Sequence, residues 1–253
     1  MKKTKLAILT AMMALAMAFP GCDGDDDVTP QTADEKTDED ILSIYEKIYR
    51  ASEVYIDGEY VVVKTNGLPD HKSPYFQGTQ WESQYEQNND PAFRQNPNKI
   101  SEHSYTFRFP KDPEEATSKS ATPLGAIGVS LNGVPFFNQY AGPSQPLTSE
   151  IFSFDQYSGH PTGGGHYHYH IEPVSLTTTF GKTALLGFLL DGFPVYGPTE
   201  NGNTVTNADL DDYHGHSHAT TEYPEGIYHY HITSNDPYIN GNGFFGTPGT
   251  VGE

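Results

Sequence analysis

Short apolar and aromatic runs, separated by glycine, proline and asparagine, dominate the second half of the chain. The runs are 126–129, 134–137, 151–154, 184–190 and 193–196. Runs of this length between turn-forming residues predict a mainly β domain, an antiparallel β-sandwich or a barrel-like fold with long loops. Residues 104–109 alternate as a further short strand, whereas 66–98 and 111–122 are predicted as loop and polar connection because they lack an apolar pattern.

One short helix is predicted before these strands, over about residues 40–51. Its apolar positions recur at helical spacing behind a Thr37-Asp38 start, and they are Ile41, Ile44, Tyr45, Ile48 and Tyr49. The next segment, 53–65, predicts a β-hairpin because β-branched residues flank Asp57-Gly58.

The N-terminus has the pattern of an export signal. Lys2, Lys3 and Lys5 precede an apolar run from Leu6 to Phe19, and Cys22 stands at the expected cleavage point. The pattern resembles a lipoprotein signal, so residues 1–21 are predicted to be a signal peptide and Cys22 to carry the lipid. The alternative is ordinary secretion with a free Cys22.

The segment 22–40 is predicted to be a disordered acidic tether, because it has too little apolar surface to offset its ordering entropy. Residues 41–253 then form a single domain with a core at about 54–248. An acidic run behind the cysteine resembles a surface-export signal. The lipid anchor therefore predicts a cell-envelope location, on either the periplasmic or the surface face of the outer membrane.

The charge balance excludes one class of partner. The chain has 33 acidic and 14 basic residues and a formal net charge of −19. Nucleic acid requires a basic footprint, so it is not an expected partner. Membrane contact is expected through the lipid anchor only, and any extracellular ligand stays unknown.

One short repeat carries most of the candidate chemistry. Residues 165–171 (GHYHYHI) align with 226–232 (GIYHYHI), and a third histidine cluster, YHGHSH, lies between them at 213–218. On a strand, residues two apart share a face and lie about 6.5–7 Å apart. The histidines of each motif therefore point one way, and its tyrosines point the other.

This alternation predicts a metal site. A His-x-His pair on a strand can chelate one ion, and two such strands side by side would supply four nitrogens, from His168, His170, His229 and His231. His166 is a possible extra ligand, and His214, His216 and His218 are further candidates. The competing interpretation places the histidines on a solvated face, with the tyrosines packed as cross-strand pairs.

Ligand chemistry narrows the metal to Zn or Cu(II). All four methionines lie in the leader, and Cys22 is the only cysteine, so the domain has no sulfur ligand. Imidazole suits Zn and Cu(II), whereas Cu(I) prefers sulfur. Carboxylates could join as ligands or as acceptors behind the histidines, and Asp191 and Asp212 are among the candidates.

Several ordered stretches resemble the bacterial YHYH-domain family. They are TNGLPDH (65–71), TPLGAIGVSLNGVPFFN (122–138), GHPTGGGHYHYH (159–170), LLGFLLDGFPVYGP (185–198), EGIYHYHIT (225–233) and PYINGNGFFGTP (237–248). His71 and His160 fall within these motifs, and the resemblance makes them secondary ligand candidates. It implies no particular reaction.

Three functions therefore stay open. The first is an exported, lipid-anchored protein that binds Zn or Cu(II). The second is a metalloenzyme, hydrolytic or oxidative, in which the histidines leave one coordination position free. The third is an adhesion or glycan-binding module without metal, in which the tyrosines and phenylalanines form the binding face.

Overall fold

The computed structural model describes residues 36–253, which contain eighteen strands and two α-helices. The mainly β prediction is confirmed, and the sheets in these residues are open rather than closed into a barrel. The predicted signal peptide, Cys22 and most of the predicted tether lie outside the described residues. None of the helices in residues 36–253 has the length and apolar composition to cross a bilayer.

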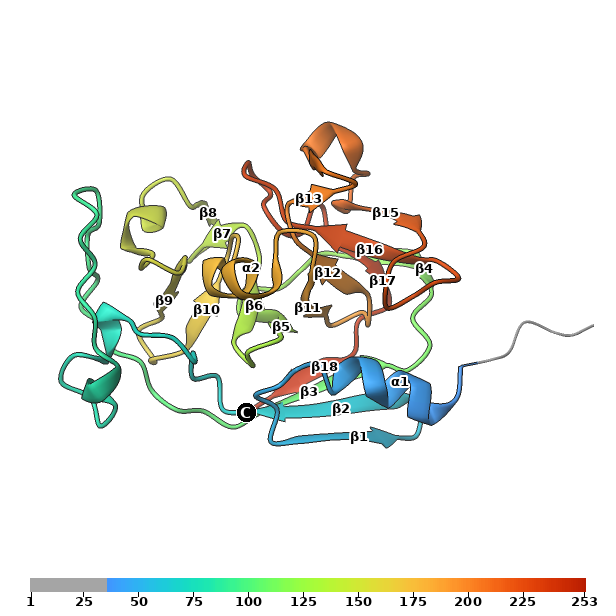
Figure 1. Cartoon of the computed structure of the whole chain (residues 1–253), viewed down its shortest axis with the longest axis horizontal. Helices are drawn as coiled ribbons and strands as arrows, with labels where there is room; N and C mark the ends of the chain where they lie inside the picture. The colour runs from blue at the N-terminus through green and yellow to red at the C-terminus, as the bar shows by residue number, and fades with distance from the viewer. Residues whose placement is uncertain (1–35) are drawn as a thin grey trace, which may run out of the picture. The chain divides into compact units, whose positions relative to one another are not determined.

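A four-stranded antiparallel sheet with the order β1-β2-β3-β18 forms one layer (Figure 1). Its strands are β1 (Glu53–Asp57), β2 (Tyr60–Thr65), β3 (Tyr105–Pro110) and β18 (Thr250–Gly252). The predicted hairpin over 53–65 and the strand over 104–109 are confirmed. Helix α1 (Asp38–Tyr45) contacts β1 and β2, and a capping box between Thr37 and Asp40 fixes its start. It includes the last three residues assigned to the tether and ends earlier than predicted.

An eight-stranded sheet forms the second layer, with the order β15-β16-β12-β11-β5-β6-β10-β9. Its strands are β5 (Ala126–Ser130), β6 (Pro135–Phe137), β9 (Gly159–Pro161), β10 (Tyr167–Tyr169), β11 (Leu185–Leu189), β12 (Pro194–Tyr196), β15 (Gly215–His218) and β16 (Ile227–His231). The pairs β6–β10 and β12–β16 are parallel, and the other pairs of this sheet are antiparallel.

Three two-stranded ribbons and a second helix complete the described elements. The ribbons pair β4 (Glu115–Ser120) with β17 (Phe244–Gly246), β7 (Tyr140–Ala141) with β8 (Gln145–Pro146), and β13 (Thr199–Glu200) with β14 (Asn203–Thr204). The second helix is α2 (Val174–Phe180), and the short 3-10 helices are η1 (Pro74–Phe76), η2 (Glu82–Gln84), η3 (Glu150–Ser153) and η4 (Asn207–Asp209).

Three of these elements differ from the sequence prediction. The connection over 111–122 contains β4, which is a strand because β17, far along the chain, pairs with it. The run 151–154 forms η3 rather than a strand, and α2 was not predicted. Both helical elements are too short to give a clear 3.6-residue pattern.

Aromatic side chains join the two layers. Tyr45 of α1 stacks on Phe188 of β11 with ring centroids 4.3 Å apart, and it also contacts Phe109 of β3 at 5.3 Å. Phe109 and Phe188 are fully buried. The face of the large sheet that carries Phe188 is therefore covered by the small sheet and α1.

The large sheet is built from two copies of one unit. Strands β5, β6, β9 and β10 correspond in order and pairing to β11, β12, β15 and β16, so the sheet order reads the same from either edge. The two units meet at the antiparallel pair β5–β11. Sequence likeness follows this correspondence, since DQYSGHP (155–161) matches DDYHGHS (211–217). The repeat therefore extends well beyond the Tyr-His-Tyr-His motif.

Equivalent tyrosines make equivalent hydrogen bonds in the two units. Tyr167 Oη donates to Asp155 at 2.9 Å, and Tyr228 Oη donates to Asp211 at 2.9 Å. The second tyrosine of each motif bonds a residue in a turn of its own unit. Tyr169 Oη accepts from Asn132 in the β5–β6 turn, and Tyr230 Oη donates to Asp191 in the β11–β12 turn. The buried tyrosines thus anchor each motif from behind and leave its histidines on the opposite face, as the alternation predicted.

A glycine beside the first tyrosine is required in both units. A Cβ at Gly159 would lie 2.4 Å from the Tyr167 ring, and one at Gly215 would lie 2.4 Å from the Tyr228 ring. We expect Gly159→Ala to lower the free energy of unfolding by about 1–3 kcal/mol, because the added methyl group displaces a hydrogen-bonded tyrosine. Gly163→Ala is the matched control, since nothing lies within 4 Å of its added methyl. Urea unfolding of both variants measures the difference, and equal losses would contradict this packing argument.

Candidate metal centres

The first unit brings three buried histidines together, which we call site 1. His160 comes from β9, His168 from β10, and His170 follows β10 by one residue. The Nε2 atom of His168 lies 3.1 Å from His160 Nε2 and 2.9 Å from His170 Nε2. Two nitrogens bound to one ion at about 2.0–2.1 Å are about 2.9 Å apart at a right angle and about 3.4 Å apart at the tetrahedral angle. The observed spacing lies within that range.

The other ring nitrogen of each site 1 histidine is held by an oxygen. His168 Nδ1 donates to the carbonyl oxygen of His166 at 2.9 Å, and His170 Nδ1 donates to that of Asn138. His160 Nδ1 lies 2.8 Å from Ser153 Oγ, whose own proton goes to the Glu150 carbonyl. A carbonyl oxygen only accepts, so the proton of each neutral ring stays on Nδ1. The converging Nε2 atoms then carry lone pairs, which is the arrangement of metal-ligating histidines.

Burial keeps the site 1 histidines neutral. It lowers the pKa of His160 to about 3 and that of His170 to about 4, and it holds the pKa of His168 well below its usual value. These imidazoles are therefore deprotonated at neutral pH, the state that binds a metal ion. Close lone pairs on neutral nitrogens repel each other, and a cation between them removes that cost.

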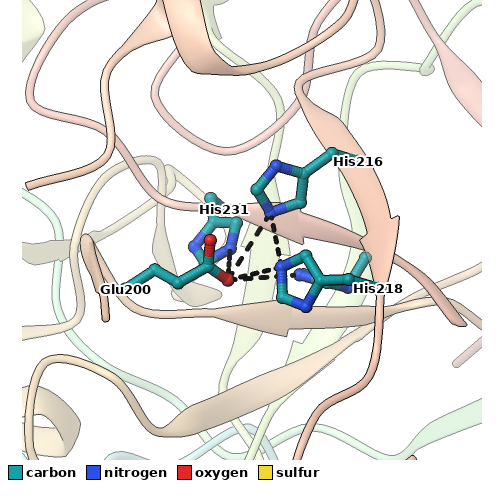
Figure 2. Close-up of side chains that lie close together, drawn as sticks. Glu200, His216, His218 and His231 are labelled. Carbon is teal, nitrogen blue, oxygen red and sulfur yellow. Dashed lines mark hydrogen bonds and ion pairs between the residues drawn. The ribbon is translucent and has the colours of Figure 1, made fainter. Parts of the chain in front are cut away.

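The second unit forms a larger cluster, site 2, from four histidines and one glutamate. Its members are Glu200, His216, His218, His229 and His231. Figure 2 shows the Glu200 carboxylate pointing among the imidazoles. Glu200 Oε1 lies 2.6 Å from His218 Nε2, 3.5 Å from His231 Nε2, 3.6 Å from His216 Nε2 and 3.9 Å from His229 Nε2.

Site 2 contains orphaned buried nitrogens. His229 Nδ1 contacts the carbonyl oxygen of Ile227 at 3.0 Å, and His231 Nδ1 contacts that of Gly197 at 2.8 Å. The Nε2 atoms of both residues are buried and have no hydrogen-bond partner. Buried polar atoms of this kind are rare in proteins and call for a partner. A metal ion among the donors would satisfy both atoms at once, so the residues fit a metal.

The electrostatics of site 2 also suit a cation. Burial lowers the pKa of His229 to about 4 and lowers that of His231 as well. Burial alone would raise the pKa of Glu200, but His218 and the three other histidines together hold it below its usual value. At neutral pH, His229 and His231 are therefore neutral and Glu200 is an ionised carboxylate.

A cavity of about 780 Å³ opens onto site 2. Glu200, His218, His229 and His231 line one part of it. Site 2 therefore has a route for small molecules, and a ligand in the cavity could reach a bound ion.

The four histidines of the repeated motif do not meet. Two side-by-side motif strands would have supplied all four nitrogens, but β6, β5, β11 and β12 lie between β10 and β16 in the sheet. His168 and His170 belong to site 1, and His229 and His231 belong to site 2. Each motif strand instead pairs with an edge strand of the sheet: β10 pairs with β9, and β16 pairs with β15.

The remaining sequence candidates divide between the sites and other roles. His160 joins site 1, and His216 and His218 join site 2. His214 bonds Thr233 Oγ1 at 2.9 Å, and His71 bonds Tyr169 Oη at 2.9 Å, so neither reaches a cluster. Asp191 is fully buried and accepts from Tyr230 and Gly246, which is a structural role. Asp212 belongs to none of the three clusters of metal-ligand side chains among the described residues.

His166 lies in a third, more exposed group with His103 and Glu253. Its Nδ1 atom is 2.7 Å from Tyr105 Oη and 3.2 Å from Glu253 Oε1, and its ring stacks on that of His103. This nitrogen already has partners, unlike the orphaned atoms of site 2. We therefore leave this group out of the candidate metal centres.

Glu200 is the site residue that sequence reasoning missed. It stands in a polar turn segment, PTENGNT, that has no metal motif of its own. Alignment of the second unit with the first does not reveal it either, because β13 corresponds to β7 and Ala141 stands at the equivalent position. The sequence therefore gives no signal for this residue.

Comparisons with known proteins identify the family of the chain. The family model described as "YHYH protein" matches residues 106–206 and 198–243, more than half of the chain. No curated protein and no solved structure gives a significant match. The matched segments include every histidine of sites 1 and 2. The chain belongs to the YHYH protein family.

Proposed function

We propose that this protein binds two transition-metal ions, one at site 1 and one at site 2. The observation that carries the proposal is the pair of buried, unpartnered Nε2 atoms on His229 and His231, whose Nδ1 atoms are already held by carbonyl oxygens. At site 1 three Nε2 atoms also converge, and the Nδ1 atom of each ring contacts an oxygen. Convergence of the ring nitrogens argues against the adhesion module, which needs no such cluster.

The donor sets support Zn or Cu(II). Three imidazoles at site 1 match a tetrahedral ion with one further position. Four imidazoles and a carboxylate at site 2 match the tetragonal nitrogen and oxygen set that Cu(II) favours. Sulfur plays no part, because the described residues include neither cysteine nor methionine.

Metal content measures the proposal directly. We expect the untagged chain, dialysed against Zn or Cu(II) and freed of excess ion, to hold two ions. His168→Ala and His229→Ala should each lower that number to one, because each removes a central ligand of one site. His103→Ala is the control and should keep both ions.

Two results would count against the proposal. If the dialysed chain held no metal, neither cluster would be a metal site. Loss of both ions in one single variant would show that the sites are not separate.

The second candidate function, a metalloenzyme, is favoured by the cavity at site 2. A metal ion bound there would supply Lewis-acid or redox chemistry, and the cavity would admit the substrate. This function predicts that His229→Ala abolishes any activity of the protein on a small substrate, while Gly163→Ala leaves it unchanged. The donor set is compatible with either hydrolysis or oxidation.

We also propose that the chain is exported and anchored by a lipid on Cys22. The support is the basic and apolar leader with its single cysteine at the expected cleavage point. Cys22→Ser should move the protein from the detergent phase to the aqueous phase in a Triton X-114 partition of whole cells. A wild-type chain that stays in the aqueous phase would contradict lipid anchoring, and unchanged partition of the variant would exclude Cys22 as the attachment point.

A further inference from the structure

The two units of the large sheet can be compared position by position, because equivalent strands build a candidate metal site in each. Three of the positions at which the units differ bear on the cavity at site 2. Phe137 at the end of β6 corresponds to Tyr196 of β12, Ala141 of β7 corresponds to Glu200 of β13, and Thr162 after β9 corresponds to His218 of β15. Tyr196, Glu200 and His218 all line the cavity of about 780 Å³ at site 2. The second unit has therefore gained polar groups where a small molecule would enter.

The cavity lining combines polar and apolar side chains. Site 2 residues, among them His229 and His231, form part of it. Leu131, Ala184 and Leu185 give it apolar walls. Its volume lies in the range of about 300–1,000 Å³ that is typical of pockets for small organic ligands.

Two aromatic side chains extend the apolar surface. Tyr49 and Phe180 line the cavity, and their ring centroids are 5.9 Å apart. They are unusually exposed for large side chains, with 46% and 48% of their surface accessible. Phe180 is the last residue of α2 and has no counterpart in the first unit. The apolar part of a ligand that packs against these rings would bury apolar surface that is exposed to solvent.

The charges around the cavity are balanced once an ion is bound. Glu222 lines the cavity, accepts from Tyr196 Oη at 2.8 Å and pairs with Lys47 Nζ at 2.9 Å. Glu200 is then the one carboxylate at the site without a cationic side chain as partner, and a divalent ion at site 2 would more than offset its charge. Charge therefore does not select the ligand, and the apolar surface does.

We infer that this cavity binds a small molecule that places a nitrogen or oxygen donor on the site 2 metal and an aromatic body against Phe180. The inference rests on the proposed metal binding and names the ligand class of that site. Five protein donors leave one position of an octahedral ion, and Glu200 is the donor best able to give way because it lies on a short, half-buried ribbon, whereas His229 and His231 are buried. Site 1, with three fully buried histidines, is assigned a structural role.

A pair of probes tests the ligand class. The Cu(II)-loaded chain is titrated with imidazole and with 4-phenylimidazole at pH 8, following the visible absorption band of the copper. Both probes are neutral and coordinate through the same nitrogen, so they differ only in the apolar body. We expect 4-phenylimidazole to bind about tenfold more tightly or better, because its phenyl ring is removed from water.

Matched variants locate the binding site. Phe180→Ala should reduce the preference for 4-phenylimidazole by about threefold or more. Phe152→Ala is the control, since Phe152 is 50% exposed but does not line the cavity, and it should keep the full preference. His229→Ala should abolish the spectral response to both probes while the copper at site 1 stays bound.

The outcomes separate the inference from the proposed function. A chain that binds no copper overturns both. A chain that binds two copper ions but takes both probes equally well, or whose preference is the same in wild type and Phe180→Ala, overturns the inference alone. Copper content measured after the titration ensures that a spectral change reports binding rather than metal removal.

Discussion

Removing the metal is expected to lower the melting temperature of the protein by about 10 °C or more. An ion that binds the folded state alone stabilises it by about 2.7 kcal/mol when its free concentration is one hundred times the dissociation constant. Two sites would contribute about twice that amount, which is a large share of the stability of an ordinary domain. In a chain of this length, each kcal/mol shifts the melting temperature by about 2–4 °C.

Differential scanning calorimetry of the loaded protein with and without EDTA measures this effect. A chain with both His168→Ala and His229→Ala is the control, and it should melt at one temperature whether or not EDTA is present. Equal melting of the wild-type protein in both conditions would mean that the imidazole clusters are stable without an ion.

The strands that local patterns specify were predicted from the sequence. The hairpin over 53–65 follows from Asp57-Gly58 between β-branched residues, and the strands that became β5, β11 and β12 follow from apolar runs between turns. β4 was missed because its sequence, EATSKS, is polar and depends on pairing with β17. Local sequence cannot indicate such a distant partner.

The chemistry of the site was predicted better than its geometry. Alternation along the motif correctly assigned the tyrosines to one packed face and the histidines to the opposite face. It could not show which strands become neighbours, so the motifs were expected to share one ion. The sheet order separates them and supplies His160 to one motif and His216 and His218 to the other.

The duplication explains why the motif occurs twice. Each copy needs the same supports, namely an aspartate that accepts from the first tyrosine and a glycine that makes room for it, as at Asp155 and Gly159. These few positions are the same in both units, whereas most of the residues around them differ. Sequence similarity between the units is therefore limited to short segments, and the equivalent strand pairing shows that these segments belong to one longer repeat.

Acid should unfold the metal-free protein between about pH 6.5 and pH 4. Burial lowers the folded-state pKa of His160 to about 3 and that of His170, His214 and His229 to about 4. In the unfolded chain these groups titrate near pH 6.5. Below that pH the unfolded state binds protons that the folded state does not, so stability falls as the pH falls. Each group contributes up to about 1.4 kcal/mol per pH unit.

Buried carboxyls act in the opposite direction. Burial raises the pKa of Asp191 to about 6, so between about pH 6 and pH 4 the folded state holds a proton there that the unfolded state lacks, and burial also raises the pKa of Asp155 and of Glu150. The histidines outnumber these carboxyls, because burial lowers the pKa of His71, His168 and His231 as well, and the net effect is a loss of stability. Urea unfolding of the metal-free protein at pH 7 and pH 5 measures this loss of stability, and equal stabilities at the two pH values would contradict the buried neutral state of the histidines.

The metal-loaded protein should resist acid further, because protons must first displace the metal from the same nitrogens. Acid resistance that depends on added Zn or Cu(II) would therefore link the pH response to metal binding at sites 1 and 2.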